Sequence, residues 1–321
     1  MDLQSLLQTT QCILAQPTAP FFEDHVRAEI LLQLGQCKNV STSVDAFGNV
    51  LARYRCGLAQ PRWILTAHMD HPAFVQGKFL GGVPEAYLRK KPPTRDFGAF
   101  EMWDLPAFEL RENLIYSRAC DDLIGCAAMV ATVQQLEREG CEAAIDLAFT
   151  CAEEVGLLGA VFLAKSNQIP KHLGVVSLET SALRAPAQMG EGAIIRVGDR
   201  SSVFDSASVA QISKTALDAS VPNQRCLMSG GTCEATAFRL YGYQVAGLCV
   251  ALGNYHNCGE NNRIAPEFVS LKDVLALTQL CVELAKDPHP PDPDAALRAR
   301  LELELELHTA RWRPELLPNR D

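Results

Sequence analysis

Five short segments of acidic residues and histidine, spread over nearly two hundred positions, contain side chains that can together bind two metal ions. Most of them follow an apolar run that predicts a buried strand. Charged groups at the ends of buried strands are costly unless another group compensates them. A pair of metal ions is the simplest compensation that accounts for all five segments, which are Ala67–Asp70, Cys120–Asp122, Ala152–Gly156, Leu178–Thr180 and Asn254–His256.

His68 has an alternative interpretation, because a single histidine after a strand is more often a satisfied, partly buried side chain than a ligand. Asp70 stands two residues later and can orient an imidazole, which favours the ligand interpretation. Asp122 is well placed to cap a helix, and an acid at a helix start is stabilising by itself. That role does not account for Asp121, which is left free to bridge two cations.

Glu153 and Glu154 are the hardest pair to explain by structure alone. Two adjacent carboxylates directly after the apolar run 147–150 repel each other near the core. If one binds metal and the other faces the metal-bound water, both are explained. Glu179 alone fits a rim position and His256 alone is a weak signal, so the joint pattern carries the two-metal prediction.

Two metal ions in such a site polarise a carbonyl group and lower the pKa of a bridging water toward about 7. A carboxylate beside that water takes its proton and delivers it to the leaving amine. The ligands are oxygen and nitrogen atoms without thiolate, a set that suits Zn²⁺, Co²⁺ or Mn²⁺. We therefore predict two divalent metal ions, with Zn²⁺ as first choice and Co²⁺ or Mn²⁺ as alternatives.

The spacing of apolar residues around these segments is typical of alternating strands and helices. It predicts an α/β fold with a mixed, largely parallel sheet and helices on both faces, in which ligands gather at the carboxyl ends of strands. Strands are expected at 44–50 (as a strand, turn and strand), 63–67, 144–150, 173–178 and 245–252. Helices are expected at 3–16, 24–35, 123–138, 157–165, 203–218 and 268–286.

Composition divides the chain into three parts. Residues 1–73 and 118–286 form the predicted metal-binding catalytic domain, interrupted by residues 74–117, where glycine and proline separate short β-like pieces. This small β-rich insertion is expected to serve as a lid or a dimer contact. Residues 287–321 are expected to begin as a proline-rich linker and to continue as a helical tail, although the leucine–glutamate alternation at 301–307 also fits a strand.

Bulk composition excludes several classes of partner. A net charge of −9 and a pI near 5.3 argue against a nucleic-acid partner and against an anionic membrane surface. No apolar run reaches the roughly 20 residues of a membrane span, and residues 1–4 lack the start of a signal peptide. The twelve cysteines are scattered without a CxxC pair, which predicts reduced thiols in a cytoplasmic protein.

The order and wording of the motifs resemble a known family, the dinuclear metallo-aminopeptidases of the glutamyl and tetrahedral (deblocking) type. The resemblance covers about residues 15–285 and is highly specific, with matching phrases at Asp45–Val50, Ala67–Asp70, Glu153–Ala160 and Gly230–Thr232. It implies an aminopeptidase that removes N-terminal residues from peptides with a free N-terminus, often within a self-compartmentalised assembly.

The resemblance also implies a role for each site residue. One metal would be held by His68, Asp121 and Glu179. The other would be held by Asp121, Glu154 and His256, with Asp121 as the bridge. Glu153 would be the general base, and Asp70 the carboxylate partner of His68.

Three departures from the family pattern bear on function. The position after the paired acids, usually arginine, is Leu123, and the position after Gly-Gly-Thr, usually an acid, is Cys233, so contacts to the substrate are expected to differ. His68 and Asp121 lie 53 positions apart (121 − 68), roughly half the family's usual distance. Because the insertion between them carries dimer contacts in the family, we expect a homo-oligomer of at least a dimer.

Two other functions fit parts of the pattern. A carboxypeptidase or an N-acyl amino-acid deacylase has the same His-x-Asp, bridging Asp and Glu-Glu motifs, but its insertion usually follows the strand with the Glu179-type ligand. An inactive metal-binding structural protein usually lacks the base or a ligand, and this chain keeps all of them. The aminopeptidase is therefore the preferred hypothesis.

Overall fold

The computed structural model describes residues 2–89, 92–286 and 294–312, in two compact units, Met1–Pro288 and His289–Asp321. The first unit contains all of the predicted site residues. The second contains helix α9 (Ala295–Trp312), so the leucine–glutamate alternation at 301–307 is helical and not a strand. The proline-rich linker predicted from residue 287 lies, up to residue 293, outside the described residues.

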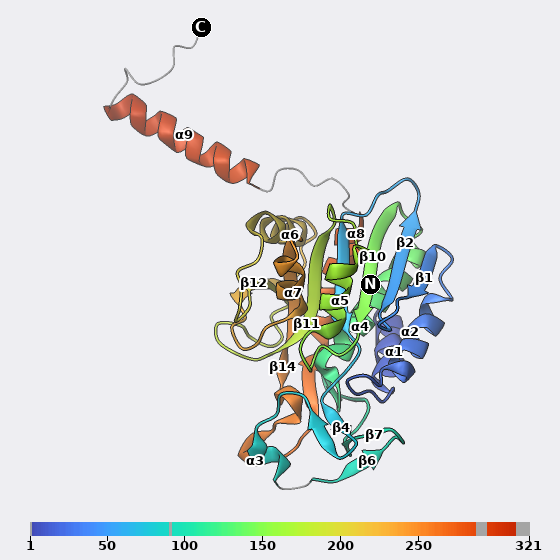
Figure 1. Ribbon diagram of the computed structural model, residues 1–321. Coiled ribbons are helices and arrows are strands. Elements are labelled where there is room, and N and C mark those ends of the chain that lie inside the picture. The colour runs from blue at the N-terminus through green and yellow to red at the C-terminus, as the bar shows by residue number, and fades with distance from the viewer. Residues whose placement is uncertain (1, 90–91, 287–293, 313–321) are drawn as a thin grey trace. The chain divides into compact units, whose positions relative to one another are not determined.

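A large mixed sheet forms the centre of the first unit (Figure 1). Its four middle strands run parallel, because apolar runs buried on both faces favour that arrangement. They are, in order, β10 (Ala143–Thr150), β3 (Trp63–His68), β11 (Gly174–Ala182) and β14 (Val245–Gly253). Every residue of β3 and β10 is buried. The predicted α/β fold is confirmed.

Antiparallel strands extend the sheet on both sides. Strands β1 (Val40–Val44) and β2 (Val50–Cys56) form the predicted hairpin beside β10, and Asp45 Oδ1 accepts three backbone N–H bonds inside its turn. Gly48 has a φ of 101° in that turn, a backbone conformation that favours glycine. The other side is formed by β15 (Glu267–Ser270), β9 (Leu114–Ser117), β8 (Glu109–Arg111), β12 (Ala193–Gly198) and β13 (Asn223–Leu227).

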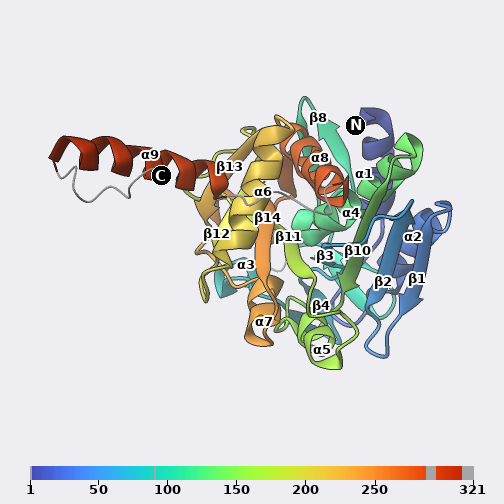
Figure 2. The ribbon, with the colours of Figure 1, turned by 90° about the horizontal axis from the view of Figure 1, so that it is seen from above.

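Helices cover both faces of the sheet, as the view from above shows (Figure 2). One face carries α4 (Cys120–Glu139), α6 (Ser206–Asp218) and α8 (Leu271–Lys286), and the other carries α5 (Leu158–Ser166) and α7 (Glu234–Leu240). Helices α1 (Leu3–Leu14) and α2 (Asp24–Leu34) pack on α4. The backbone of Asp121 and Asp122 is not helical, and Asp122 Oδ1 accepts from the N–H of Gly125 at 3.2 Å, which confirms the predicted cap.

A second sheet of four strands lies within the predicted insertion. Its order is β5 (Lys78–Leu80), β4 (Ala73–Val75), β7 (Phe100–Trp103) and β6 (Thr94–Asp96), with α3 (Glu85–Leu88) between β5 and β6. Figure 1 shows its strands β4, β7 and β6 at the bottom of the view. Phe74, Phe79 and Trp103 pack together in it. Residues 109–117 instead pair into the large sheet, so the separate sheet is smaller than 74–117.

Several elements differ from the sequence prediction for reasons of tertiary pairing. Helix α8 begins at Leu271, because Glu267–Ser270 pair with β9 and β14 as a strand. Strands β12 and β13 and helix α7 were not predicted. All twelve cysteines are free thiols. Over the described ranges, no helix is both long and apolar enough to cross a membrane.

Candidate metal centre

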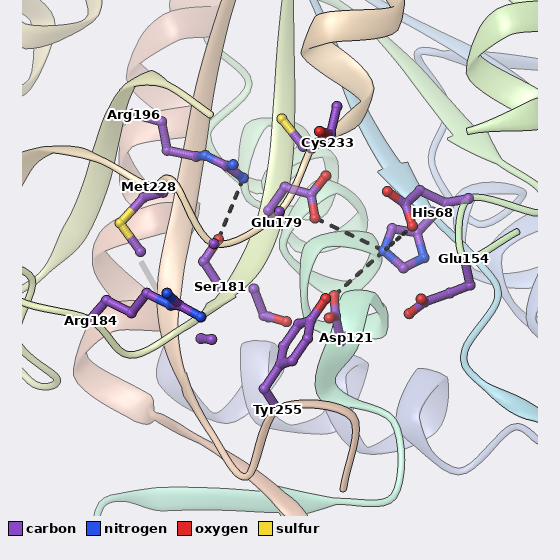
Figure 3. A pocket seen from close by; sticks show the side chains of 16 residues that line it. His68, Asp121, Glu154, Glu179, Ser181, Arg184, Arg196, Met228, Cys233 and Tyr255 are labelled. Atoms are coloured by element: carbon purple, nitrogen blue, oxygen red, sulfur yellow. Dashed lines mark hydrogen bonds and ion pairs between the residues drawn. The ribbon is translucent and has the colours of Figure 1, made fainter. Parts of the chain in front are cut away.

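The central strands bring the five predicted ligands together. Figure 3 shows His68, Asp121, Glu154 and Glu179 converging beside one pocket. His68 is the last residue of β3, Glu154 follows β10, and His256 follows β14. Asp121 stands at the non-helical start of α4. Glu179 differs from expectation, because it lies within β11, which continues to Ala182, and not after the end of the strand.

Asp121 lies between the two histidines. Its Oδ1 is 3.5 Å from His68 Nε2, and its Oδ2 is 3.5 Å from His256 Nε2. A second carboxylate faces each imidazole, with Glu179 4.0 Å from His68 Nε2 and Glu154 3.1 Å from His256 Nε2. Ligand atoms held about 2.1 Å from a tetrahedral Zn²⁺ lie roughly 3.4 Å apart, so these spacings fit two ions that share Asp121.

Hydrogen bonds fix which nitrogen of each histidine is available. His68 Nδ1 lies 3.1 Å from the backbone carbonyl oxygen of Asp70, and His256 Nδ1 lies 2.9 Å from that of Gly82. A carbonyl oxygen only accepts, so each Nδ1 carries the proton and donates it. Both Nε2 atoms, which point at Asp121, are left unprotonated in the neutral imidazole, the state that binds metal.

The converging atoms are buried and lack protein partners. His68, Asp121 and His256 are each at most 3% exposed. Within the described part of the chain, Asp121 Oδ1, Glu154 Oε1 and His256 Nε2 are buried without a hydrogen-bond partner, since the close pair His256–Glu154 is not oriented as a hydrogen bond. Buried, unpartnered oxygen and nitrogen atoms of this kind fit divalent cations.

The crowded charges shift the pKa values of the site residues. Burial raises the pKa of Glu179 to about 8. Burial also acts to raise the pKa of Asp121, but the facing imidazoles of His256 and His68 outweigh it, and the pKa is lowered. Burial acts to lower the pKa of His68, but the carboxylates of Glu153, Asp121 and Asp70 together outweigh it, so that pKa is raised. Metal binding must therefore displace protons that these groups share.

Asp70 contacts both halves of the site. Its Oδ1 is 3.5 Å from His68 Nδ1 and accepts from the backbone N–H of Glu153 at 2.9 Å. Its Oδ2 accepts from the backbone N–H of Glu154 at 3.1 Å. Asp70 is fully buried, so one carboxylate positions the imidazole and the pair of glutamates together.

Glu267 on β15 is a site residue that the sequence analysis missed. It is fully buried, and its two oxygens accept from the backbone N–H of Asp121 at 3.0 Å and of His256 at 2.8 Å. It therefore sets the distance between the bridging carboxylate and one histidine. The signal in the sequence is weak, because Glu267 is a single acid directly before the run 268–286, whose spacing predicts a helix.

A pocket of about 90 Å³ opens beside the ligands. Its outer walls are formed by Thr180–Ala182, Arg184, Arg196, Met228, Gly230–Cys233 and Tyr255. Two of the departures from the family pattern are the single residues Leu123 and Cys233. Cys233 lines this pocket, and its backbone N–H donates to Asp199 Oδ2 at 3.0 Å. Leu123 is fully buried in α4 and is not one of the lining residues, so that departure changes core packing.

Arg196 on β12 is an unpaired cation in the pocket wall. It is 3% exposed, its Nη1 donates to Ser181 Oγ at 3.4 Å, and its Nε is buried without a partner among the described residues. None of the described carboxylates forms an ion pair with it within 4.0 Å. A buried guanidinium without a carboxylate in an ion pair with it is costly, so the position of Arg196 on a pocket wall indicates an anionic group in the ligand.

Comparisons with known proteins place these observations in a family context. The family described as M42 glutamyl aminopeptidase matches residues 96–279. No curated protein matches the sequence. Several solved structures are similar to this chain. Because their sequence identities are below 25%, this similarity is evidence for a shared fold and not for a shared function.

Three of these structures illustrate the likeness. The TET1 peptidase of Pyrococcus horikoshii is 21% identical, with a TM-score of 0.71, covering 88% of this chain and 99% of that chain. The TET aminopeptidase of the marine sediment archaeon Thaumarchaeota archaeon SCGC AB-539-E09 is 19% identical, with a TM-score of 0.73 and coverages of 88% and 97%. Aminopeptidase APDkam598 of Desulfurococcus kamchatkensis is 17% identical, with a TM-score of 0.73 and coverages of 91% and 96%.

Proposed function

Because this chain belongs to the M42 glutamyl aminopeptidase family and is therefore a metal-dependent aminopeptidase, we propose that the pocket beside Asp121 is where it hydrolyses the first peptide bond of its substrates. The observation that carries this assignment is the sharing of Asp121 between two histidine–carboxylate sets at the edge of a pocket.

Two divalent metal ions are the cofactors that this donor set fits best, with Zn²⁺ as first choice and Co²⁺ or Mn²⁺ as alternatives. We assign His68, Asp121 and Glu179 to one ion, and Asp121, Glu154 and His256 to the other. When bound, the ions would polarise the scissile carbonyl and make water nucleophilic at neutral pH.

Glu153 is our candidate for the general base. Its carboxylate lines the pocket and is 4.0 Å from His68 Nε2, and Asp70 holds its backbone N–H. Glu153 takes a proton from the attacking water and later gives it to the leaving nitrogen, which balances the proton over the reaction.

The carboxylates around the pocket favour an exopeptidase. Glu153 lines the pocket and is not assigned to an ion, so its negative charge can attract a cationic α-ammonium group there. An acetylated N-terminus carries no charge and adds bulk at the same place. A free N-terminus is therefore the expected requirement, in contrast to a deacylase.

Arg196 is the basis for a proposal on side-chain preference. The family's name refers to glutamyl substrates, and a buried, unpaired guanidinium in the pocket wall suits a carboxylate on the N-terminal residue. We propose that peptides beginning with Glu or Asp are the preferred substrates.

We further propose a homo-oligomer of at least two chains. The TET1 peptidase of Pyrococcus horikoshii can assemble into a tetrahedron or a large octahedral shell. This chain has a second sheet at 73–103 in the place of the predicted dimer contact. Light scattering that finds only a 35.1 kDa species would contradict the proposal. We also assign the protein to the cytoplasm, because its free thiols suit a reducing compartment.

The function is tested with one Glu-initiated peptide and its N-acetylated twin, using Zn²⁺-loaded protein. We expect release of free glutamate from the unmodified peptide alone, with the activity lost after EDTA treatment and restored by metal. Cleavage of the acetylated twin, or release from the carboxyl end, would move the assignment to a deacylase or a carboxypeptidase.

A further inference from the structure

The turn that bears His256 also directs a tyrosine into the pocket. Tyr255 lines the pocket, and its ring stacks on the His256 imidazole with centroids 3.8 Å apart and planes at 21°. Figure 3 shows the ring pointing from its backbone toward Asp121. The phenol therefore lies at the metal centre, where a scissile carbonyl would be.

This turn is held rigidly. Asn254, His256 and Asn257 all have positive φ values, of 54°, 52° and 60°, a conformation that non-glycine residues keep only when their surroundings impose it. Asn254 Nδ2 donates to the Pro266 carbonyl at 2.8 Å, and Asn257 Nδ2 donates to that of Arg118 at 3.1 Å. Together with the Glu267 bond to the His256 N–H, these contacts fix the direction of Tyr255.

The hydroxyl of Tyr255 is available as a donor. Among the described residues it makes no hydrogen bond to protein, whereas Tyr87 and Tyr243 each donate to a carbonyl, those of Gly259 and Ile169. An unperturbed phenol has a pKa of about 10, so it carries its proton at neutral pH. The other cationic side chains in the wall are Arg184, which is exposed, and Arg196, which lies on β12. Hydroxyl groups are also contributed by Thr180, by Ser181, which accepts from Arg196, and by Thr232, which is paired with Ser201.

We propose that the Tyr255 hydroxyl donates a hydrogen bond to the substrate carbonyl oxygen and stabilises the negative charge that this oxygen acquires during hydrolysis. The proposal rests on the function assigned above. It makes Tyr255 a catalytic residue in addition to Glu153 and the five ligands.

The step can be written with atoms and charges in balance. Water oxygen bonds to the carbonyl carbon while Glu153 takes one water proton, and the carbonyl π pair moves onto the oxygen. Tyr255 donates its hydrogen bond to that oxygen and keeps its proton. On collapse the pair returns, the C–N bond breaks, and the nitrogen takes the proton from Glu153. The preorganised donor is most valuable when the oxygen is most negative.

The test is Tyr255→Phe, which keeps the ring stacked on His256 and removes only the hydroxyl. Tyr241→Phe is the matched control, because Tyr241 is equally exposed, at 39%, and does not line the pocket. For both variants we would measure kcat and KM on a Glu-initiated peptide, and metal content by elemental analysis. Calorimetry would give the affinities for free glutamate and for the phosphonic acid analogue of glutamate, a tetrahedral anion.

We expect Tyr255→Phe to keep two metal ions, to lose on the order of 10²-fold in kcat, and to change KM little. The affinity for the phosphonate should be much lower in Tyr255→Phe than in the wild type, whereas the affinity for glutamate should be almost the same in both. Wild-type kcat, an equal weakening of both ligands, or loss of metal would each overturn the proposal. A wild-type enzyme that cleaves no free peptide would instead refute the function itself, independently of Tyr255.

Discussion

Replacing Arg196 with methionine should abolish the preference for acidic N-terminal residues while leaving the fold intact. Methionine fills much of the volume of the arginine stem and lines the pocket beside Met228, which is itself 4% exposed. Because no described carboxylate lies within 4.0 Å of Arg196, the change breaks no close ion pair. Exchange of a buried charge for an apolar side chain is often neutral or stabilising. The thermal midpoint should therefore stay the same or rise.

The size of the effect follows from the contacts that Arg196 can offer. Its Nε is free, and Nη1 has only the 3.4 Å contact with Ser181. A hydrogen bond to a charged group contributes about 1.5–3 kcal/mol. At about 1.36 kcal/mol for each factor of ten, its loss lowers kcat/KM for a Glu-initiated peptide roughly 10- to 150-fold.

The assay compares peptides that begin with Glu and with Gln, which have nearly the same shape and differ in charge. The ratio of their kcat/KM values cancels changes in metal content or folded fraction. Arg184→Met is the control, because Arg184 lines the same pocket but is exposed. An exposed ion pair contributes about 0–1 kcal/mol, so that variant should change the ratio at most about fivefold.

Two results would refute this reasoning. An unchanged Glu to Gln ratio in Arg196→Met would mean that the guanidinium does not meet the substrate side chain. A strongly lowered thermal midpoint would mean that Arg196 stabilises the fold through the more distant charges of Glu179 and Asp199, and that its place in the pocket wall is incidental.

Three further predictions concern groups at and behind the metal centre. Glu153→Gln should retain both metal ions in elemental analysis and lose about 10²–10⁴-fold in kcat, as expected for a general base, whereas loss of metal would indicate a ligand. Asp70→Asn should weaken metal binding about 10- to 100-fold in a chelator competition, because the partner of His68 loses its charge, and unchanged affinity would exclude that role. Glu23 is buried near Asp70, and burial raises its pKa from 4.5 to about 7. Between these two pH values the folded state of the metal-free protein binds more protons than the unfolded state, so the free energy of unfolding falls as pH rises from 4.5 to about 7. Urea denaturation should show that fall in the wild type and a flatter profile in Glu23→Gln, and parallel profiles would contradict it.

The meeting of the candidate ligands was predictable from the sequence because a simple rule of topology applies to them. Apolar runs marked β3, β10 and β14, and parallel strands place their carboxyl ends along one edge of a sheet. His68, Glu154 and His256 follow such runs, so their meeting needed no knowledge of the tertiary structure. The exception, Glu179 within β11, shows the limit of the rule, since a strand can continue past the residue that faces the site.

The residues that hold or surround the ligands were not predictable in the same way. Glu267 acts through two backbone groups on α4 and after β14, and its strand exists only because it pairs with β9 and β14. Arg196 lies on β12, and no local pattern of residues indicated a strand there. In both cases the function of the side chain depends on pairings between distant segments, which the local pattern does not encode.

The insertion that contains the second sheet also contacts the candidate metal centre, in addition to its proposed role in assembly. Gly82, in the segment between β5 and α3, provides the carbonyl that fixes the proton on His256 Nδ1 and so leaves Nε2 facing Asp121. Tyr87 of α3 donates to the Gly259 carbonyl, three residues beyond that histidine. The turn that carries His256 and Tyr255 is thus held from one side by the catalytic sheet through Glu267 and from the other by the insertion. We therefore expect that a shorter insertion must keep these contacts. Without them the tautomer of His256, a candidate metal ligand, would no longer be determined, and the side chain of Tyr255 would no longer be held in one orientation.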